Sequence, residues 1–485
     1  MSTQVELKPE SVFRIFSEIN KVPRPSFKED KMTEYLVDFA KKHGLEYRVD
    51  EVGNVAIDKP ATKGFESRKK VIMQGHQDMV CEKNADVTID FEKDPIQTYI
   101  DGEWMKAKGT TLGADCGIGD AIALAVLEDT TIQHGPIEAV FTRDEETNLG
   151  GAFGMKPGFM DGDILINLDS EDEGQLFVGC AGGLGTTATF KFDTIAVPQD
   201  YFFFKISVKG LVGGHSGDDI NKKRANANKV LVRFLYDALA KYDMYVCDIH
   251  GGKLHNAIPR EAYAVCAIPM KDKESIRVDL NAYAADIENE YHVTEKTPEI
   301  KMESSDKVST AVSRHIIKKA IAALQGVFNG IFAMSQDIDT LVETSTNLAS
   351  IKIENNAIVV ETSQRSSVKS AVHNVANTVR AVFELAGAKV VSGDAYPGWA
   401  LNPKSEILQI AKESYERVFH KEPVVRAIHA GLECGLFSEK YPNLDMISFG
   451  PTLRGVHSPD ERLLIPTVDM VWRHLLDVLV HIPEK

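Results

Sequence analysis

The strongest constraint on the fold is a set of short, continuous apolar runs in the first 185 residues. These runs cover residues 70–74, 137–141 and 163–168, and a buried-helix pattern at 120–129 lies between the first two. Strands without apolar–polar alternation belong to sheets that are covered on both faces, as in α/β proteins. The sequence therefore predicts an α/β sheet whose strands are connected by helices.

The middle of the chain has a different character. It predicts a strand at 201–208, a long amphipathic helix at 225–242, a hairpin at 351–360 that turns at Asn355–Asn356, and a helix at 367–386. This mixture is typical of an α+β domain. An apolar strand at 444–450 and a closing helix at 467–481 resemble the first part again. We therefore predict one α/β domain, formed by residues 1–185 and 395–485, which is interrupted by an inserted α+β domain at 186–394.

The charge balance limits the partners of this chain. Its 485 residues include 55 Lys+Arg and 71 Asp+Glu, which gives a net charge of −16. Nucleic acids and anionic membranes require a basic face, and no apolar stretch reaches the roughly 18 residues of a membrane span. The N-terminus does not resemble a signal peptide, and the six cysteines are scattered without CxxC spacing. We expect a cytoplasmic protein that binds neither nucleic acids nor membranes.

Histidines and carboxylates follow several of the predicted strands. In an open α/β sheet, ligands bind beyond the carboxyl ends of the strands, so these side chains are expected to share one site. The candidates are His76, Asp78, Asp115, Glu145, Glu146, Asp169 and His457.

Two imidazoles with several carboxylates suit Zn²⁺, Mn²⁺ or Co²⁺. Two such ions would lie about 3.5–4 Å apart and need a bridging carboxylate, for which Asp115 in its glycine-rich turn is the natural choice. Asp78 is too close to His76 in sequence to share its metal easily, so it is expected to orient the imidazole. If Glu146 binds metal, Glu145 is free to accept a proton from water, which predicts a hydrolase.

Each motif also has an ordinary structural interpretation. The turn that contains Asp115 is compatible with a helix cap, the acidic pair Glu145–Glu146 with a solvated loop, and His457 with a surface histidine. The combination at successive strand ends favours the metal site. The sequence contains no HExxH motif, GxSxG nucleophile elbow or Walker A loop.

The ordered set resembles the M20 family of co-catalytic metallopeptidases, and in detail its Xaa-His dipeptidase branch (aminoacyl-histidine dipeptidase, peptidase D). The resemblance covers essentially the whole chain. It rests on four strings: Gly75-His-Gln-Asp-Met-Val, Thr111-Leu-Gly-Ala-Asp-Cys-Gly-Ile-Gly, Arg143-Asp-Glu-Glu-Thr and Gly213-Gly-His-Ser-Gly. It implies a zinc-exopeptidase-like catalytic domain with an inserted lid domain that carries dimer contacts.

The resemblance also implies roles for individual residues. One zinc ion would be held by His76 and Asp169 and the other by Glu146 and His457, with Asp115 bridging them. Glu145 would be the general base and acid, and the Asp115–Cys116 peptide bond would be cis.

In the inserted domain, the resemblance implies that His215 polarises the scissile carbonyl. Asn256 and Arg365 resemble residues that hold the free carboxylate of the substrate, for which a bidentate arginine is chemically suited. Ordinary alternatives stay open here as well: a loop histidine for His215, and a surface salt bridge for Arg365.

We therefore expect a cytoplasmic, homodimeric hydrolase with two Zn²⁺ ions per subunit, or Co²⁺ or Mn²⁺ in their place. It would cleave unblocked dipeptides, including Xaa-His and β-Ala-His (carnosine), through a metal-bridging hydroxide activated by Glu145. The alternatives are an M20-type amidohydrolase for N-acyl amino acids, an exopeptidase for tripeptides or other aminoacyl substrates, and a non-catalytic metal-binding member.

Overall fold

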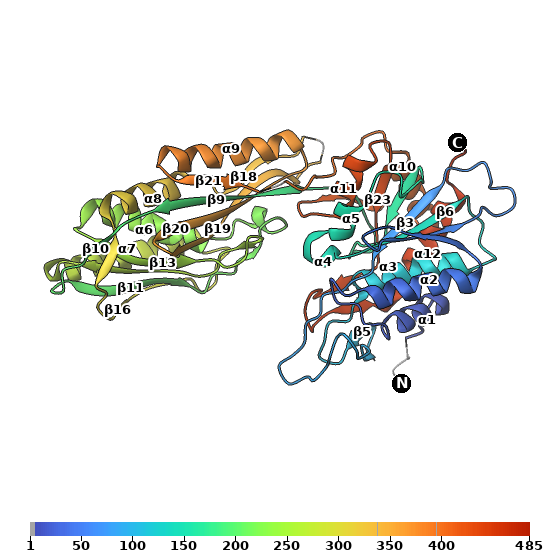
Figure 1. Cartoon of the computed structure of the whole chain (residues 1–485), viewed down its shortest axis with the longest axis horizontal. Helices are drawn as coiled ribbons and strands as arrows, with labels where there is room; N and C mark the ends of the chain where they lie inside the picture. Colours follow the sequence, from blue (N-terminus) through green and yellow to red (C-terminus); the bar gives the residue numbers. More distant parts are fainter. Residues whose placement is uncertain (1–4, 337, 394) are drawn as a thin grey trace. The chain divides into compact units, whose positions relative to one another are not determined.

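The protein forms two compact units in a computed structural model that describes residues 5–336, 338–393 and 395–485. Unit 1 comprises the chain up to Gly179 together with 399–427 and 432–485, and unit 2 comprises 180–398 and 428–431 (Figure 1). The predicted fold class, an α/β domain with an inserted α+β domain, is confirmed. Residue 394, the predicted end of the inserted domain, lies outside the described residues, and the role of this domain as a lid stays a prediction.

Unit 1 is built on a mixed eight-stranded sheet. In spatial order its strands are β1 (Glu46–Val49), β2 (Val55–Lys59), β6 (Ile137–Thr142), β3 (Val71–His76), β7 (Ile164–Asn167), β23 (Asp445–Ser448), β8 (Gln175–Cys180) and β22 (Val424–Ile428). The central strands β6, β3, β7 and β23 are parallel. Every residue of β3 and β6 is buried, so both faces of the sheet are covered, as the continuous apolar runs predict.

Helices provide that cover. They are α1 (Glu10–Ile19), α2 (Asp30–His43), α3 (Ala114–Glu128), α10 (Glu406–Phe419), α11 (Glu433–Lys440) and α12 (Ile465–Val480), with the short α4 (Glu145–Asn148) and α5 (Gly150–Gly154). The predicted helix at 120–129 in fact begins at Ala114. Its first turn is irregular, because Asp115 and Cys116 have non-helical backbone angles. The peptide bond between these two residues is cis, as the resemblance implies.

A small antiparallel sheet in unit 1 carries one further loop of interest. Its order is β24 (Leu453–Arg454), β25 (Arg462–Leu464), β5 (Trp104–Ala107) and β4 (Thr98–Asp101). The loop between β24 and β25 contains His457, whose φ of 61° lies in the left-handed region.

Unit 2 is an antiparallel sheet with four helices packed against it (Figure 1). The strand order is β16 (Glu299–Ser304), β11 (Phe202–Lys209), β15 (Ala262–Ile268), β13 (Tyr245–Gly251), β19 (Val342–Glu354), β20 (Ala357–Ser366), β9 (Gly182–Lys191) and β21 (Lys389–Ser392), with β18 (Gly330–Met334) beside β19. The helices are α6 (Ala227–Lys241), α7 (Lys273–Glu290), α8 (Arg314–Gly326) and α9 (Lys369–Leu385). The predicted hairpin turn at Asn355–Asn356 is confirmed, and both residues have positive φ.

Two pairs of short strands complete unit 2: β12 (Gly214–His215) with β14 (Ala257–Ile258), and β10 (Thr194–Ala196) with β17 (Thr310–Val312). The segment 428–431 belongs to this unit although the sequence analysis did not separate it. The reason is backbone pairing, because the N–H of Ala181 lies 3.1 Å from the carbonyl of Ile428 and 3.0 Å from that of Ala430.

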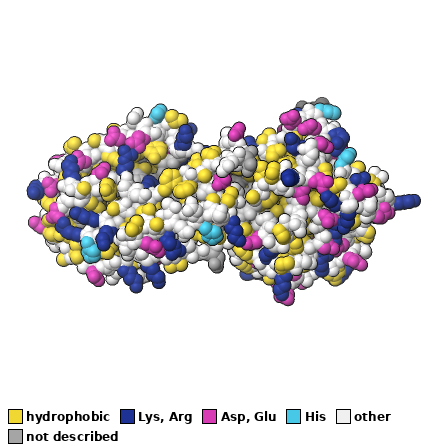
Figure 2. Space-filling model, turned by 90° about the horizontal axis from the view of Figure 1, so that it is seen from above, with side chains coloured by type: hydrophobic (Ala, Val, Ile, Leu, Met, Phe, Trp, Pro, Cys, Tyr) yellow, Lys and Arg dark blue, Asp and Glu magenta, His cyan; other side chains and the backbone are white. Residues whose placement is uncertain are grey.

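The surface carries both signs of charge. On the face drawn in Figure 2, Lys and Arg side chains are interspersed with Asp and Glu. Within the described part of the chain, none of the helices combines the length and apolar character that a membrane crossing requires.

Candidate metal centre

The predicted ligands in unit 1 lie at the ends of strands and at the first turn of a buried helix. They are His76 at the end of β3, Asp115 in the first turn of α3, Glu146 in α4 directly after β6, Asp169 after β7, and His457 between β24 and β25. Parallel strands place their carboxyl ends at the same edge of a sheet. The structure therefore brings together five residues that span 381 positions of sequence (from 76 to 457).

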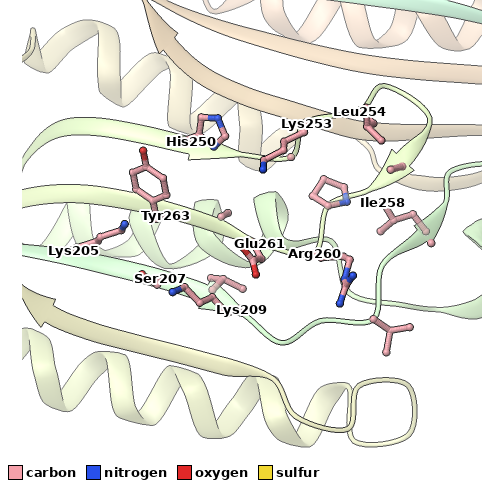
Figure 3. A pocket seen from close by; sticks show the side chains of 17 residues that line it. Lys205, Ser207, Lys209, His250, Lys253, Leu254, Ile258, Arg260, Glu261 and Tyr263 are labelled. Carbon is pink, nitrogen blue, oxygen red and sulfur yellow. The ribbon is translucent and has the colours of Figure 1, made fainter. Parts of the chain in front are cut away.

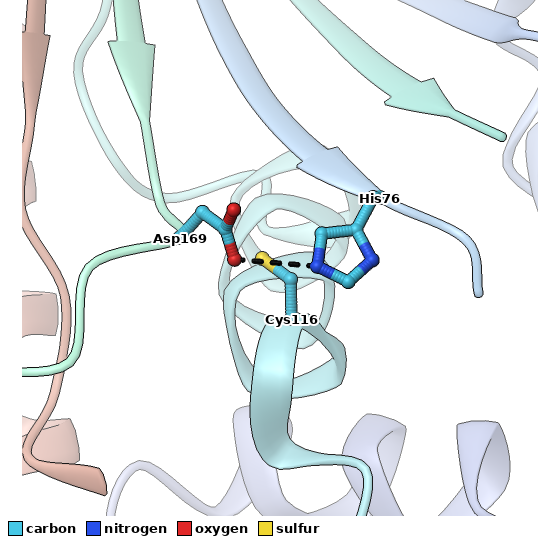
Figure 4. Close-up of side chains that lie close together, drawn as sticks. All are labelled: His76, Cys116 and Asp169. Carbon is cyan, nitrogen blue, oxygen red and sulfur yellow. Dashed lines mark ion pairs between the residues drawn. The ribbon is translucent and has the colours of Figure 1, made fainter. Parts of the chain in front are cut away.

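One imidazole faces two carboxylates. His76 Nε2 lies 3.2 Å from Asp115 Oδ1 and 3.3 Å from Asp169 Oδ1. Figure 4 shows His76 and Asp169 pointing toward each other, with the Cys116 thiol beside them. On the other side of the ring, His76 Nδ1 lies 3.3 Å from Asp78 Oδ1, so Asp78 is placed to orient the imidazole rather than to join the ligands.

The second imidazole uses the other oxygen of the same aspartate. His457 Nε2 lies 3.2 Å from Asp115 Oδ2 and 2.8 Å from Glu146 Oε2. Asp115 therefore divides its two oxygens between His76 and His457. This is the arrangement expected of a carboxylate that bridges two metal ions.

The donor atoms fit divalent cations. Glu146 Oε1 is buried and accepts no hydrogen bond from any described residue, although an unsatisfied buried oxygen is costly. Imidazole nitrogens with carboxylate oxygens are ligands that zinc and related metals accept. The residues present therefore fit a pair of such ions.

Electrostatics supports the same interpretation. Burial, together with the charge of Asp115, raises the pKa of Asp169 to about 6. Hydrogen bonds to Asp115 and Glu146 raise the pKa of His457 to about 11. The cluster thus attracts protons when no other cation balances it, and divalent ions would replace those protons.

Glu145 lies beside the ligands but is paired with none of them. Its side chain is partly exposed. Desolvation, opposed by His76 and reinforced by Asp169 and Glu146, raises the pKa of Glu145 well above its ordinary value. Its backbone N–H donates to Asp78 Oδ1 at 3.0 Å, so the carboxylate that contacts His76 also contacts Glu145.

Among the buried glutamates of unit 1 that the sequence did not single out, Glu461 and Glu433 contact the elements that carry the predicted ligands. Glu461 is 2% exposed, and its carboxylate accepts the backbone N–H groups of the turn that carries Asp115. Glu433 accepts hydrogen bonds from Gln74 Nε2 at 2.6 Å and Thr142 Oγ1 at 2.7 Å. The only available signal was the position of Glu461 four residues after His457.

Unit 2 brings His215 and Arg365 together. His215 lies on β12, and its Nε2 is 3.3 Å from Arg365 Nη2 on β20. Arg365 also donates to Tyr396 Oη at 3.2 Å. The guanidinium is 5% exposed, its Nε has no hydrogen-bond partner, and it forms no ion pair with a described carboxylate. A buried cation without a counter-ion is costly, so this position suits an anionic ligand.

Asn256, the other predicted residue of unit 2, contacts the neighbour of His215 through its backbone. Asn256 is exposed, and its backbone carbonyl accepts the N–H of Ser216 at 2.8 Å, next to His215. A buried histidine that sequence reasoning missed, His429, pairs with Ser345 Oγ at 2.7 Å. Burial and the charge of Arg365 lower the pKa of His429 to about 3, which keeps this imidazole neutral.

A pocket of about 910 Å³ lies elsewhere on unit 2 (Figure 3). Its cationic lining residues are Lys205, Lys209, Lys253 and Arg260. None of the predicted site residues lines this pocket.

Comparison with known proteins places these residues in a family. Residues 72–481 match the model of peptidase family M20/M25/M40. The chain is 43% identical to the cytosol non-specific dipeptidase of Escherichia coli (strain K12) over 485 residues, which is 100% of both chains.

Solved structures agree with this match. The aminoacylhistidine dipeptidase of Vibrio alginolyticus is 43% identical, with a TM-score of 0.89, and the alignment covers 99% of this chain and 98% of that one. A tripeptidase from Staphylococcus aureus shares the fold at 15% identity, with a TM-score of 0.56 and 98% of each chain covered. The resemblance predicted from the sequence is confirmed, and the chain belongs to peptidase family M20/M25/M40.

Proposed function

We propose that this protein is a dinuclear metal-dependent dipeptidase that hydrolyses unblocked dipeptides, including Xaa-His and β-Ala-His (carnosine). One observation carries the proposal: Asp115 presents one oxygen to His76 and the other to His457, with the unpaired Glu145 beside them. The two full-length relatives described above, whose names are dipeptidases, support the substrate class.

The proposed cofactor is a pair of Zn²⁺ ions in each subunit, with Co²⁺ or Mn²⁺ as possible substitutes. His76 and Asp169 would hold one ion and Glu146 and His457 the other, with Asp115 contacting both. When bound, the ions supply Lewis-acid chemistry that polarises the substrate carbonyl and acidifies water.

The side chains of unit 1 move and direct the protons. Glu145 accepts a proton from the attacking water and later passes it to the leaving amine. Asp78 keeps His76 in a fixed orientation through the contact at Nδ1. Because Asp78 also accepts the N–H of Glu145, a single carboxylate controls the position of both a ligand and the base.

The proposed roles in unit 2 concern the substrate. Arg365 lacks an anionic partner among the described residues, and it would bind the C-terminal carboxylate of a dipeptide, assisted by Asn256. His215 would donate to the carbonyl oxygen as negative charge develops there. We further propose that the inserted domain acts as a lid and provides the contacts of a homodimer, and that the protein is cytoplasmic, as the name of its E. coli relative says of that protein.

A hydrolysis panel with parallel metal analysis tests this function. The substrates are Xaa-His dipeptides, carnosine, other dipeptides, tripeptides and N-acetylated amino acids, assayed before and after chelation and after restoring Zn²⁺. We expect dipeptides to be cleaved fastest, activity to disappear with the metal, and about two ions per subunit. Preferential cleavage of N-acyl amino acids or tripeptides would support the alternative amidohydrolase or exopeptidase, and full metal content without any hydrolysis would support a non-catalytic protein.

A further inference from the structure

A short segment between α1 and α2 contacts three turns of the candidate metal centre. We call residues 24–29 the strap; they lie outside residues 72–481, which match the family model. The strap runs beside Met79, which follows His76 and Asp78 in the sequence. Pro25 pairs with Met79 as a parallel bridge, and the N–H of Met79 donates to the carbonyl of Arg24 at 3.1 Å. The strap is therefore part of the framework around His76.

Arg24 joins two of these turns. Its side chain is 1% exposed, and the guanidinium donates to the carbonyl of Asp78 at 2.9 Å and to that of Gly113 at 2.6 Å. It forms no ion pair with any described carboxylate, and burial of a charge without a counter-ion is costly. Arg24 is thus a poor choice for stability alone. With a longer hydrogen bond to the carbonyl of Gln77 at 3.5 Å, its three hydrogen bonds fix the backbone beside His76 and beside Asp115.

The approach of Arg24 depends on a glycine. Gly113 has a φ of 67°, and a Cβ at this position would lie 2.6 Å from Arg24 Nη2. A side chain would therefore be strained and would displace the guanidinium. The turn that presents Asp115 and the strap fit each other only with glycine at this position.

Ser26 contacts the Asp78 carboxylate directly. Its hydroxyl donates to Asp78 Oδ2 at 2.8 Å. The same fully buried carboxylate accepts the N–H groups of Glu145 at 3.0 Å and Glu146 at 3.2 Å, and lies 3.3 Å from His76 Nδ1. Ser26 therefore supplies one of the contacts that set the direction of the Asp78 carboxylate.

The far end of the strap holds the turn that carries the base. Glu29, which is 0% exposed, accepts the N–H of Asp144 at 3.0 Å and a hydrogen bond from Arg143 Nη2 at 2.7 Å. The N–H of Phe27 donates to the carboxylate of Asp144. Asp144 has a φ of 53°, which is an uncommon conformation for a non-glycine residue, and these contacts hold it there.

We propose that the strap is a positioning element of the metal centre: through Asp78 it sets the orientation of His76, and through residues 143–146 it sets the reach of Glu145. This inference rests on the proposed function for its catalytic part. Its effect on metal binding does not depend on which substrate the enzyme cleaves.

Ser26→Ala is the main test, because it removes one hydroxyl and leaves the fold intact. Arg24→Met and Arg24→Lys form a second pair, in which lysine keeps the charge but reaches fewer carbonyls. Lys28→Ala is the matched control, since this strap side chain is exposed and its ammonium pairs with Glu92. Each full-length protein is assayed for Zn²⁺ affinity by chelator competition, for the visible spectrum of its Co²⁺ form, and for kcat and KM with a dipeptide.

We expect Ser26→Ala to weaken metal affinity roughly 10–100-fold, as is typical for residues that support ligands, and to alter the Co²⁺ spectrum. Its kcat should fall about 10-fold or more with KM within about twofold. Arg24→Lys should retain more of the metal affinity and of kcat than Arg24→Met, and Lys28→Ala should match the wild type in both.

Wild-type metal affinity, Co²⁺ spectrum and kcat in Ser26→Ala would overturn the proposal, as would a loss of thermal stability alone. If Arg24→Met does not fold, Ser26→Ala still decides. If the wild-type enzyme cleaves no dipeptide, the proposed function fails, whereas metal affinity and the Co²⁺ spectrum still test the strap.

Discussion

The carboxylate of Glu461 accepts the backbone N–H of Asp115 at 3.4 Å, across 346 positions of sequence. The same carboxylate accepts the N–H groups of Leu112 at 2.7 Å, Gly113 at 3.1 Å and Ala114 at 2.8 Å. One buried acid thus satisfies four successive donors of the turn that presents the bridging aspartate. Because Glu461 directly precedes β25, at the end of the loop that contains His457, it connects this loop with the turn that contains Asp115.

Glu461→Gln should loosen this turn. An amide offers one acceptor oxygen in place of two, and its NH₂ group would face backbone donors, so buried N–H groups lose their partners at roughly 1–3 kcal/mol each. We expect a lower melting temperature and roughly 10–100-fold weaker Zn²⁺ binding, measured by calorimetry and chelator competition. The adjacent and exposed Asp460 provides the control Asp460→Asn, and equal metal affinity in both variants would contradict the role assigned to Glu461.

The sequence predicts that these side chains lie together, because the physical signal for their positions is local. His76 and Asp169 follow continuous apolar strands, and the topology of a parallel sheet places such positions at one edge. The roles of individual ligands came from the family resemblance. The same resemblance predicts that Asp115 lies between His76 and His457, as the structure shows.

The supporting residues could not be predicted in the same way. Arg24, Ser26 and Glu461 act on backbone groups or on a carboxylate far away in sequence, and their own sequence surroundings look like ordinary loops. A buried arginine that binds carbonyls has no periodic signal, because its partners are set by tertiary structure alone. For the same reason the sequence analysis did not separate 428–431 from unit 1 or single out His429.

The adjacent acids Glu145 and Glu146 should respond differently to the same change. Glu145→Gln removes the proton acceptor but no proposed ligand, so we expect wild-type metal content and a kcat lowered by about 10²–10⁴-fold. Glu146→Gln removes an oxygen that faces His457, so we expect loss of bound metal as well. Metal analysis with steady-state kinetics distinguishes the two, and Glu416→Gln on the exposed face of α10 is the control. Full activity in Glu145→Gln would refute the assignment of the base.

Arg365→Met should discriminate between substrates with and without a free carboxylate. Removing one partner of a buried charge pair typically costs 2–5 kcal/mol, so kcat/KM for an unblocked dipeptide should fall at least about 30-fold. The corresponding dipeptide amide, which cannot form the pair, should lose much less. Arg380→Met, at a partly exposed position of α9, controls for loss of an arginine in unit 2. Equal losses for acid and amide would show that Arg365 does not read the carboxylate.

The stability of unit 1 should decrease in mild acid because of His474 on α12. Its ring is 3% exposed, Nε2 lies 2.8 Å from the carbonyl of Ala411, and burial lowers its pKa to about 4. In the unfolded chain the pKa is about 6.5, so between these values the unfolded state binds the additional proton. The contribution of the neutral His474 side chain to the stability of unit 1 is therefore fully present above about pH 6.5, and it is lost as the pH falls toward 4.

Between pH 7 and pH 5 this one group should lower the free energy of unfolding by about 2 kcal/mol. Tryptophan fluorescence in urea follows the relevant unit, because Trp104, Trp399 and Trp472 all belong to unit 1. Chelator-treated protein removes the separate effect of metal release. His474→Asn should be less stable than the wild type at pH 7 but should lose less stability on acidification, whereas His481→Asn at the exposed end of α12 should follow the wild type. An equally steep pH dependence in His474→Asn would mean that the acid sensitivity of unit 1 arises from other groups.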